Sequence, residues 1–159
     1  MNKTSGMTLI EVMITLVIAG ILIGYAVPNL RVIYLKQSLN TKANDMLVDF
    51  AFARAEAVNT GYPVSVVANG TWKNGWQVES DVNGDDTIQE SEILRKTTDI
   101  EKNLSFKDSI TPENTLITFN STGELSVNTA RTIEIQHSGL SIKKILKVGL
   151  SGNTSITSD

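Results

Sequence analysis

The sequence contains no cysteine and only one histidine among its 159 residues. The lack of cysteine excludes disulfide bonds, thiolate zinc sites and cysteine nucleophiles. The single histidine, His137, excludes a histidine cluster for a metal, and we expect this residue in a turn. The G-x-S-x-G, P-loop and G-x-G-x-x-G motifs are also missing, and the scattered serine and acidic residues form no catalytic constellation. The sequence therefore does not predict an enzyme.

A strong excess of positive charge is also missing. The chain has 14 basic and 17 acidic residues, a net charge of -3 and an isoelectric point near 5.2. A strong general affinity for nucleic acid needs many phosphates neutralised by lysine and arginine, so it is not expected. This composition leaves local basic clusters open. The length and the 41% share of apolar residues predict one compact domain with an appendage.

Charged side chains are nearly missing from residues 7–30, where Glu11 is the only one. About 20 apolar residues, each rising about 1.5 Å in a helix, match a hydrocarbon core about 30 Å thick. The segment reaches this length only if Glu11 lies inside the span, near one end. Because a carboxylate in hydrocarbon costs several kcal/mol unless it is neutralised or paired, Glu11 is a candidate functional residue.

Residues 1–6 precede this segment and carry one cation, Lys3, beside the amino terminus. Positive charge next to a first apolar helix stays in the cytoplasm, so the rest of the chain is expected across the membrane. The alternative is a cleaved secretory signal peptide, because Gly24 and Ala26 offer the small residues that signal peptidase recognises. The charged Glu11 and the unbroken continuation into further helix favour a retained anchor.

A second helical segment is predicted over residues 29–59 by apolar residues at steps of three and four. Gly61 and Pro63 should end it, because glycine supplies a left-handed cap and proline cannot continue a helix. Pro28 should kink or locally open the helix, since it removes one backbone donor. The apolar stripe consists of Leu35, Leu39, Ala43, Met46, Leu47, Phe50, Ala53, Ala57 and Val58. The residues expected largely off the stripe are Lys42, Asn44, Asp45, Asp49 and Glu56.

Residues 6–13 read G-M-T-L-I-E-V-M and, with Pro28, resemble the type IV prepilin motif. The resemblance implies that a membrane prepilin peptidase cleaves between Gly6 and Met7 and methylates the new amino terminus at Met7. It also implies that Glu11 pairs with the terminal amine of a neighbouring subunit. Two opposite charges buried together offset a desolvation cost that neither could bear alone, so such a pair would fix the axial register of assembly.

Four further segments resemble the GspH/FimT group of minor pilins and pseudopilins. These segments are 52–58 (FARAEAV), 63–66 (PVSV), 75–78 (GWQV) and 92–95 (EILR), the last one preceded by an acidic turn. The resemblance implies a pilin fold and a minor pilin that helps to initiate or cap the assembly of a type IV pilus. It leaves two alternatives open, an H-type pseudopilin of type II secretion and a DNA-binding minor pilin used in natural transformation.

The resemblance also implies partners and a location. The partners are other minor and major pilins or pseudopilins, prepilin peptidase, the inner-membrane assembly platform and inner-membrane lipid. The location is the bacterial inner membrane, crossed once, with a periplasmic head, and afterwards a pilus or pseudopilus. DNA is not a favoured partner, because members used for DNA uptake often carry an arginine-rich motif after a Ser-Gly pair, and residues 138–144 contain no arginine.

After Gly61 the apolar spacing changes from the helical period toward period two. The fold expected is therefore α+β, with a long amino-terminal helix packed on an antiparallel sheet or a pair of sheets. The expected division is a leader at 1–6, a helix at 7–60 with 7–27 in the membrane and 28–60 amphipathic, and a head at 61–159. The strands are predicted at 63–67, 75–80, 93–96, 116–119, 131–136 and 141–148, and residues 151–159 are expected to fray.

An acidic loop runs from Asp81 to Glu92. Asp81, Asn83, Asp85 and Glu92 occupy the first, third, fifth and twelfth positions of an EF-hand-like loop, which makes them candidate calcium ligands. However, the sixth position is Asp86 rather than glycine, and no helix pair is predicted around the loop. An acidic turn between strands is the favoured interpretation, and no other cofactor is expected.

Three lysines near the carboxyl end, Lys143, Lys144 and Lys147, form a candidate contact for DNA phosphate or anionic lipid. The favoured interpretation is the solvated face of an edge strand, where charge discourages aggregation. Trp72 and Trp76 are able to stack on bases, but they are favoured as core or hairpin residues.

Overall fold

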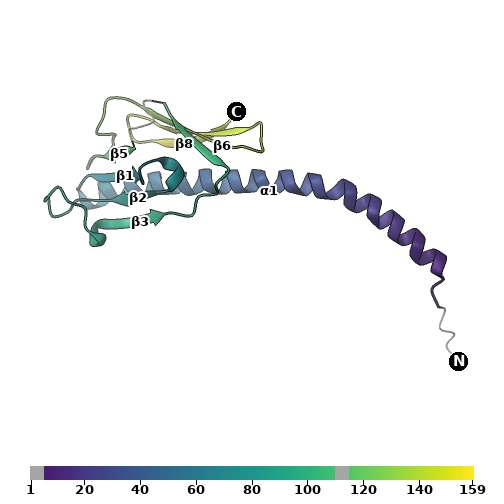
Figure 1. Ribbon diagram of the computed structural model, residues 1–159. Helices are drawn as coiled ribbons and strands as arrows, with labels where there is room; N and C mark the ends of the chain where they lie inside the picture. Colours follow the sequence, from purple (N-terminus) through teal and green to yellow (C-terminus); the bar gives the residue numbers. More distant parts are fainter. Residues whose placement is uncertain (1–5, 110–114) are drawn as a thin grey trace.

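The computed structural model describes residues 6–109 and 115–159. Its first element is one long helix, α1 (Leu9–Thr60), of 52 residues. Figure 1 shows the carboxyl-terminal half of α1 beside the strands of the head, while the amino-terminal half projects away from the head and curves. At about 1.5 Å per residue, such a helix is about 80 Å long, so one continuous element joins the amino terminus to the core of the head.

Both ends of α1 are capped by side-chain or backbone chemistry that the sequence supplies. At the amino end, Thr8 and Glu11 form a capping box, in which each side chain accepts a hydrogen bond from the backbone N–H of the other residue. At the carboxyl end, Gly61 takes a left-handed conformation with φ of 77° and donates its N–H to the carbonyl of Ala57 at 3.0 Å. This confirms the predicted end of the helix.

The head contains two antiparallel sheets of four strands each within the described residues. The first sheet has the order β3 (Ile93–Thr97), β2 (Trp76–Glu79), β1 (Val64–Ala68) and β5 (Leu116–Phe119). The second has the order β4 (Leu104–Asp108), β6 (Arg131–His137), β7 (Lys143–Val148) and β8 (Thr154–Ser158). Two short 3-10 helices, η1 (Trp72–Asn74) and η2 (Glu90–Glu92), lie in the connections. The α+β prediction is confirmed.

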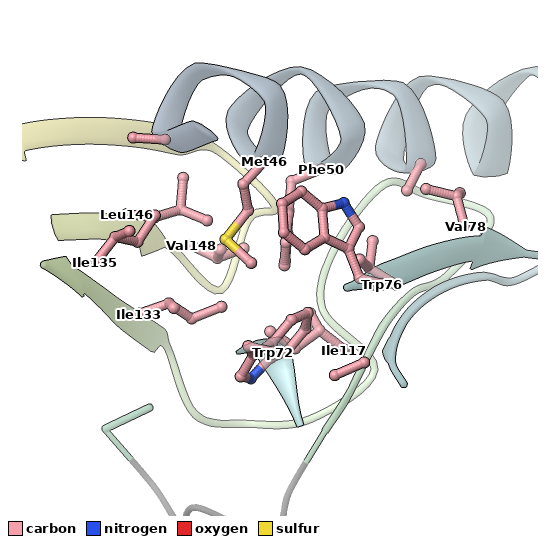
Figure 2. Close-up of a cluster of buried hydrophobic side chains, with 14 of the residues drawn as sticks. Met46, Phe50, Trp72, Trp76, Val78, Ile117, Ile133, Ile135, Leu146 and Val148 are labelled. Atoms are coloured by element: carbon pink, nitrogen blue, oxygen red, sulfur yellow. The ribbon is translucent and has the colours of Figure 1, made fainter. Parts of the chain in front are cut away.

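The core forms where α1 lies across both sheets. Figure 2 shows Met46 and Phe50 pointing from α1 toward side chains that come from the strands of both sheets. The Phe50 ring lies 6.1 Å from Trp72 and 6.3 Å from Phe119, centroid to centroid, within the range in which aromatic pairs attract each other. The buried residues of α1 are Leu39, Ala43, Met46, Phe50, Ala53 and Ala57, each at most 1% exposed. Trp72 and Trp76 are confirmed as core residues.

Two strands were not predicted from the sequence. The first is β4, which pairs with β6, and the second is β8, which pairs with β7 over residues that were expected to fray. The prediction of a frayed end at 151–159 is therefore wrong, because the antiparallel ladder to β7 binds the backbone of this polar segment. Two residues of α1 were also misplaced: Asp49 is buried and Val58 is 55% exposed.

The helix continues through Pro28 without an interruption. The local opening predicted there is not observed, since the backbone remains helical on both sides of the proline. Figure 1 shows the bend of α1 spread along its amino-terminal half instead of concentrated in one turn. A gradual curve of this kind needs only small changes in successive hydrogen bonds.

Candidate assembly site at the amino-terminal helix

Gly6 and Met7 lie directly before α1 in non-helical backbone. Thr8, the next residue, is extended, with φ of -79° and ψ of 153°. The side chain of Met7 is 66% exposed. The peptide bond between Gly6 and Met7 therefore lies in accessible backbone outside the helix, which is the condition a protease needs to reach a bond.

Glu11 lies in the first turn of α1 and its carboxylate is held by Thr8. One carboxylate oxygen, Oε2, accepts hydrogen bonds from the backbone N–H and from the hydroxyl of Thr8, both at 3.1 Å. In return, the hydroxyl oxygen of Thr8 accepts the backbone N–H of Glu11 at 3.3 Å. These bonds satisfy donors that the start of a helix leaves unpaired, and they hold the carboxylate at Thr8.

No cation pairs with Glu11 within the part of the chain that the structure describes. Its charge is compensated only by hydrogen bonds and by the positive end of the helix dipole. A cation placed beside this carboxylate would therefore compensate a charge that no cation among the described residues neutralises.

The segment that follows Glu11 is apolar on all sides and exposed. An 18-residue window in α1 has a mean hydropathy of 2.3 and no buried residue, and the helix is long and apolar enough to cross a membrane by length and composition. Its exposed large side chains include Ile14, Leu16, Val17, Ile21, Leu22 and Ile23. In water this surface would be costly, at about 25 cal/mol for each Å² of apolar area left exposed.

The acidic loop does not gather its carboxylates into a ligand set. Among the described residues there is no group of three or more His, Cys, Asp or Glu side chains that could hold a metal. Instead, Asp81 accepts the backbone N–H groups of Gly84 and Asp86 at 2.7 and 3.0 Å. Glu92 accepts those of Val82, Asn83 and Gln89 between 3.0 and 3.4 Å.

The other two candidate calcium ligands, Asn83 and Asp85, also bind backbone N–H groups of the loop. Asn83 accepts the N–H of Asp85, and Asp85 accepts that of Thr87, both at 2.8 Å. Asp86, at the position usually taken by glycine, adopts a positive φ of 59°. The acidic side chains thus bind the backbone of their own loop and shape the turn between β2 and β3.

The three lysines of the predicted phosphate contact do not share one face. In the pairing of β6 with β7, Lys144 lies opposite Ile135, whereas Lys143 and Lys147 lie opposite Gln136 and Thr132. Because successive side chains of a strand point to opposite faces, Lys144 is separated from the other two. The sequence signal that would have shown this is the period of two along β7.

Two of these lysines have polar partners. Lys143 forms ion pairs with Glu134 at 3.5 Å and with Asp159 at 3.2 Å, and these carboxylates raise the pKa of Lys143. Lys144 donates to the hydroxyl of Ser158 at 2.8 Å. The pattern agrees with a solvated sheet surface better than with a site for phosphate. The predicted edge position is wrong, because β7 lies between β6 and β8.

Asp49 forms polar contacts between α1 and the first sheet that were not predicted from the sequence. Its carboxylate accepts the indole N–H of Trp76 at 2.8 Å and the hydroxyl of Thr97 at 3.3 Å, and it pairs with Arg95 at 3.0 Å. The guanidinium of Arg95 lies 5.1 Å from the centre of the Phe52 ring. The bonds explain why a charged residue is tolerated in the buried face of the helix.

A second set of polar contacts lies at the end of the head closest to the exposed half of α1. His137, expected in a turn, is instead buried at the end of β6. Its Nδ1 accepts the N–H of Gly139 at 3.0 Å, and its Nε2 lies 3.4 Å from Glu101. Glu101 also accepts the hydroxyl of Ser38, and this bond, followed by the contact with His137, lowers the pKa of Glu101.

The architecture, a long apolar helix that begins at a Gly-Met bond and packs on an antiparallel head, is that of a pilin-type filament subunit. Two family models match the sequence: "Type II transport protein GspH" over residues 42–152 and "Prokaryotic N-terminal methylation motif" over residues 1–27. The chain belongs to the GspH family of minor pilins and pseudopilins. The predicted family is thus confirmed, and it is a family of structural subunits.

Solved structures of two proteins share this fold. The type IV minor pilin FimU of Pseudomonas aeruginosa has 21% sequence identity and a TM-score of 0.64, covering 77% of this chain and 90% of that chain. The minor pseudopilin EpsH from the Type 2 Secretion System of Vibrio cholerae has 15% identity and a TM-score of 0.58, covering 76% and 97%. At these identities the likeness establishes the fold alone. No curated protein matches the sequence.

Proposed function

We propose that this chain is a minor pilin that helps to initiate or cap the assembly of a type IV pilus. In this proposal residues 1–6 are a cytoplasmic leader, residues 7–60 form the helix with 7–27 in the inner membrane, and residues 61–159 form a periplasmic head. Prepilin peptidase removes the leader and methylates Met7. The observation that carries the proposal is the exposed apolar helix with one carboxylate, Glu11, beside an accessible Gly-Met bond.

The energetic argument concerns the partner of Glu11. Within one chain this carboxylate has only Thr8 as a hydrogen-bond partner among the described residues, and it lies at the start of a segment suited to hydrocarbon. A buried carboxylate without a cation costs several kcal/mol, and an ion pair offsets much of that cost. The processed amine of a neighbouring subunit supplies the cation, so pairing occurs only at one axial offset between subunits.

The test is the substitution Glu11→Ala in the full-length chain, in the host that makes the filament. Thr15→Ala is the matched control, because Thr15 is another polar residue one turn further along, and its hydroxyl bonds only to the carbonyl of Val12. We expect Glu11→Ala to remain in the membrane fraction and to be lost from sheared filaments, while Thr15→Ala enters both. Normal incorporation of Glu11→Ala would refute the register role.

Processing is tested separately by mass spectrometry of the native amino terminus. The expected chain starts at methylated Met7. A chain that starts at Val27 would instead indicate a secretory signal peptide, and the anchor would then be absent from the mature protein. Leader retention in a Gly6→Val variant, with unchanged membrane insertion, would support cleavage at this bond.

An H-type pseudopilin of type II secretion is the second candidate function, supported by the GspH family match and by the fold shared with EpsH. Deletion of the gene separates the two candidates, because loss of pili with normal secretion supports the first and the reverse supports the second. A DNA-binding role has less support, since the candidate lysines lie on two faces of the sheet and two of them have polar partners.

A further inference from the structure

The carboxyl-terminal strand β8 is the outer strand of the second sheet and pairs only with β7. The two hydrogen bonds between Lys143 and Asp159, at 3.0 and 3.1 Å, and the bond from Gly149 to Asn153 define which residues of β8 face β7. Because the pattern alternates along an antiparallel pair, the N–H and C=O groups of Thr154, Ile156 and Ser158 point away from β7. Among the described residues, none accepts a hydrogen bond from these three N–H groups.

The other outer strands differ from β8 in a way that concerns aggregation. Proteins protect open edges with charged side chains or with a covering segment. Strand β3 carries Arg95 and Lys96, and β4 carries Lys107 and Asp108. Strand β5 is covered in part, because Ser126 donates its N–H to the carbonyl of Thr118. Strand β8, with the sequence TSITS, has neither form of protection within its described residues.

A groove runs beside this open edge on the surface of α1. It is lined by Ala51, Arg54, Ala55, Val58 and Thr154 and has a volume of about 360 Å³. Two alanines and an exposed valine leave the helix surface low and apolar here, so there is room for side chains from a strand placed next to β8. The groove therefore lies where alternate side chains of an added strand would point.

Arg54 gives the groove a positive charge. Its Nε donates to the carbonyl of Gly123 at 3.0 Å, which holds the side chain in place. Its two terminal nitrogens have no hydrogen-bond partner among the described residues. On β7, Lys144 lies opposite Ser158 of β8 and on the same face of the sheet as Thr154, so it adds a second positive charge beside this edge. A carboxylate on the incoming segment would complement this charge.

We propose that β8 is the docking edge for an extended segment of a different filament subunit. The segment adds to the second sheet as a fifth strand, bonds to the outward N–H and C=O groups of β8, covers the groove on α1 and places a carboxylate at Arg54. This inference rests on the proposed function as a filament subunit, and it adds which surface of the head makes a contact and what kind of segment fits it.

The test is hydrogen exchange at single-residue resolution on the full-length chain. Exchange is measured on the purified chain in detergent and on the chain assembled with the other subunits of its filament. We expect the amides of Thr154, Ile156 and Ser158 to slow by at least about tenfold on assembly. The amides of Ser155 and Thr157 already bond to β7 and should be slow in both states.

A variant pair tests the groove. Ala55→Lys places a large cation in it, whereas Asn44→Lys places the same group on an exposed position of α1 outside it. We expect Ala55→Lys to lose the slowing of the outward amides and Asn44→Lys to keep it. Equal behaviour of the two variants would count against the groove as part of the contact.

Three results would overturn the inference. Incorporation into the filament with unchanged exchange at Thr154, Ile156 and Ser158 refutes the docking edge and leaves the proposed function intact. Slow exchange of these amides in the purified chain alone, dependent on its concentration, would mean that the occupant is a second copy. Failure of the wild-type chain to assemble would refute the proposed function, and the docking edge would fall with it.

Discussion

The two halves of α1 share one continuous backbone but are built for different surroundings. In the carboxyl-terminal half, apolar residues form a stripe, and those that face the head, such as Leu39 and Phe50, are fully buried. In the amino-terminal half, apolar residues occupy every side and are exposed, as for Ile18 and Leu22. The difference shows that the distribution of apolar residues around the axis, more than their number, decides whether a helix suits a folded core or lipid.

The largest effect is expected when one large apolar side chain is removed from each half of α1 in turn. Phe50→Ala leaves a cavity between both sheets and should lower the free energy of unfolding of the head by about 3–5 kcal/mol. Ile18→Ala, in the exposed half, should leave it unchanged. Urea unfolding of the full-length chain in detergent, followed by tryptophan fluorescence, measures both. Equal losses would mean that the two halves do not differ as described.

The next largest effect is expected for Asp49, the acidic residue in the buried face of α1. Asp49→Ala removes the acceptor of the Trp76 indole and the partner of Arg95, and we expect a loss of about 2–3 kcal/mol in the free energy of unfolding. Asp45→Ala is the control, because the pair of Asp45 with Lys42 is partly exposed and worth less than about 1 kcal/mol. A loss below that of the control would contradict the role of Asp49.

The acidic loop distinguishes structural carboxylates from metal ligands. Glu92 is 7% exposed and accepts three backbone N–H groups, so Glu92→Ala should cost about 1–2 kcal/mol. Glu90→Ala, an exposed change in the same short helix, should cost little. Because the oxygens already have partners, removal of calcium with a chelator should leave the melting temperature of the wild type unchanged. A clear decrease would support the calcium site instead.

The smallest expected effect is a pH dependence at the junction between the two halves. The hydrogen bond from Ser38 and the contact with His137 lower the pKa of Glu101 below its ordinary value of 4.5. The ionised form is therefore favoured in the folded state, and its contribution to stability is present above pH 4.5 and lost as the pH falls through the lowered pKa.

The substitution Glu101→Gln isolates this contribution. The difference in the free energy of unfolding between wild type and variant should be constant above pH 4.5 and should shrink below that value. Urea titrations at several pH values measure this difference. A difference that stays constant over the whole range would show that the Glu101 carboxylate has no preferred interaction in the folded state.

Much of the fold was predictable from the sequence because it depends on local patterns. The apolar periodicity and Gly61 predicted the helix and its end. Six strands were predicted, of which β1, β2 and β6 alternate between buried and more exposed residues. Strands β4 and β8 were missed because charged or hydroxyl side chains dominate them. The backbone of β4 is ordered by β6, which is distant in sequence, and that of β8 by the preceding strand β7. The apolar pattern of either segment alone does not contain this information.

The candidate assembly site can be proposed from the sequence alone, because Gly6, Met7 and Glu11 lie close together in it. The polar contacts of Asp49 and His137 were not predictable from the sequence. Trp76, the main partner of Asp49, is 27 positions away, and Glu101 is 36 positions from His137. A polar residue looks exposed in a sequence until the fold brings a partner to it.

The absence of a break in α1 has a mechanical consequence. Because the helix is continuous between its exposed apolar turns and Leu39, the orientation of the head about the helix axis is coupled to that of Glu11. Inserting one alanine directly before Leu35 would rotate the head about the helix axis by about 100° and shift it along that axis by about 1.5 Å. Inserting seven alanines would bring its orientation to within about 20° of the original. Filament yield should therefore oscillate with the number of inserted residues.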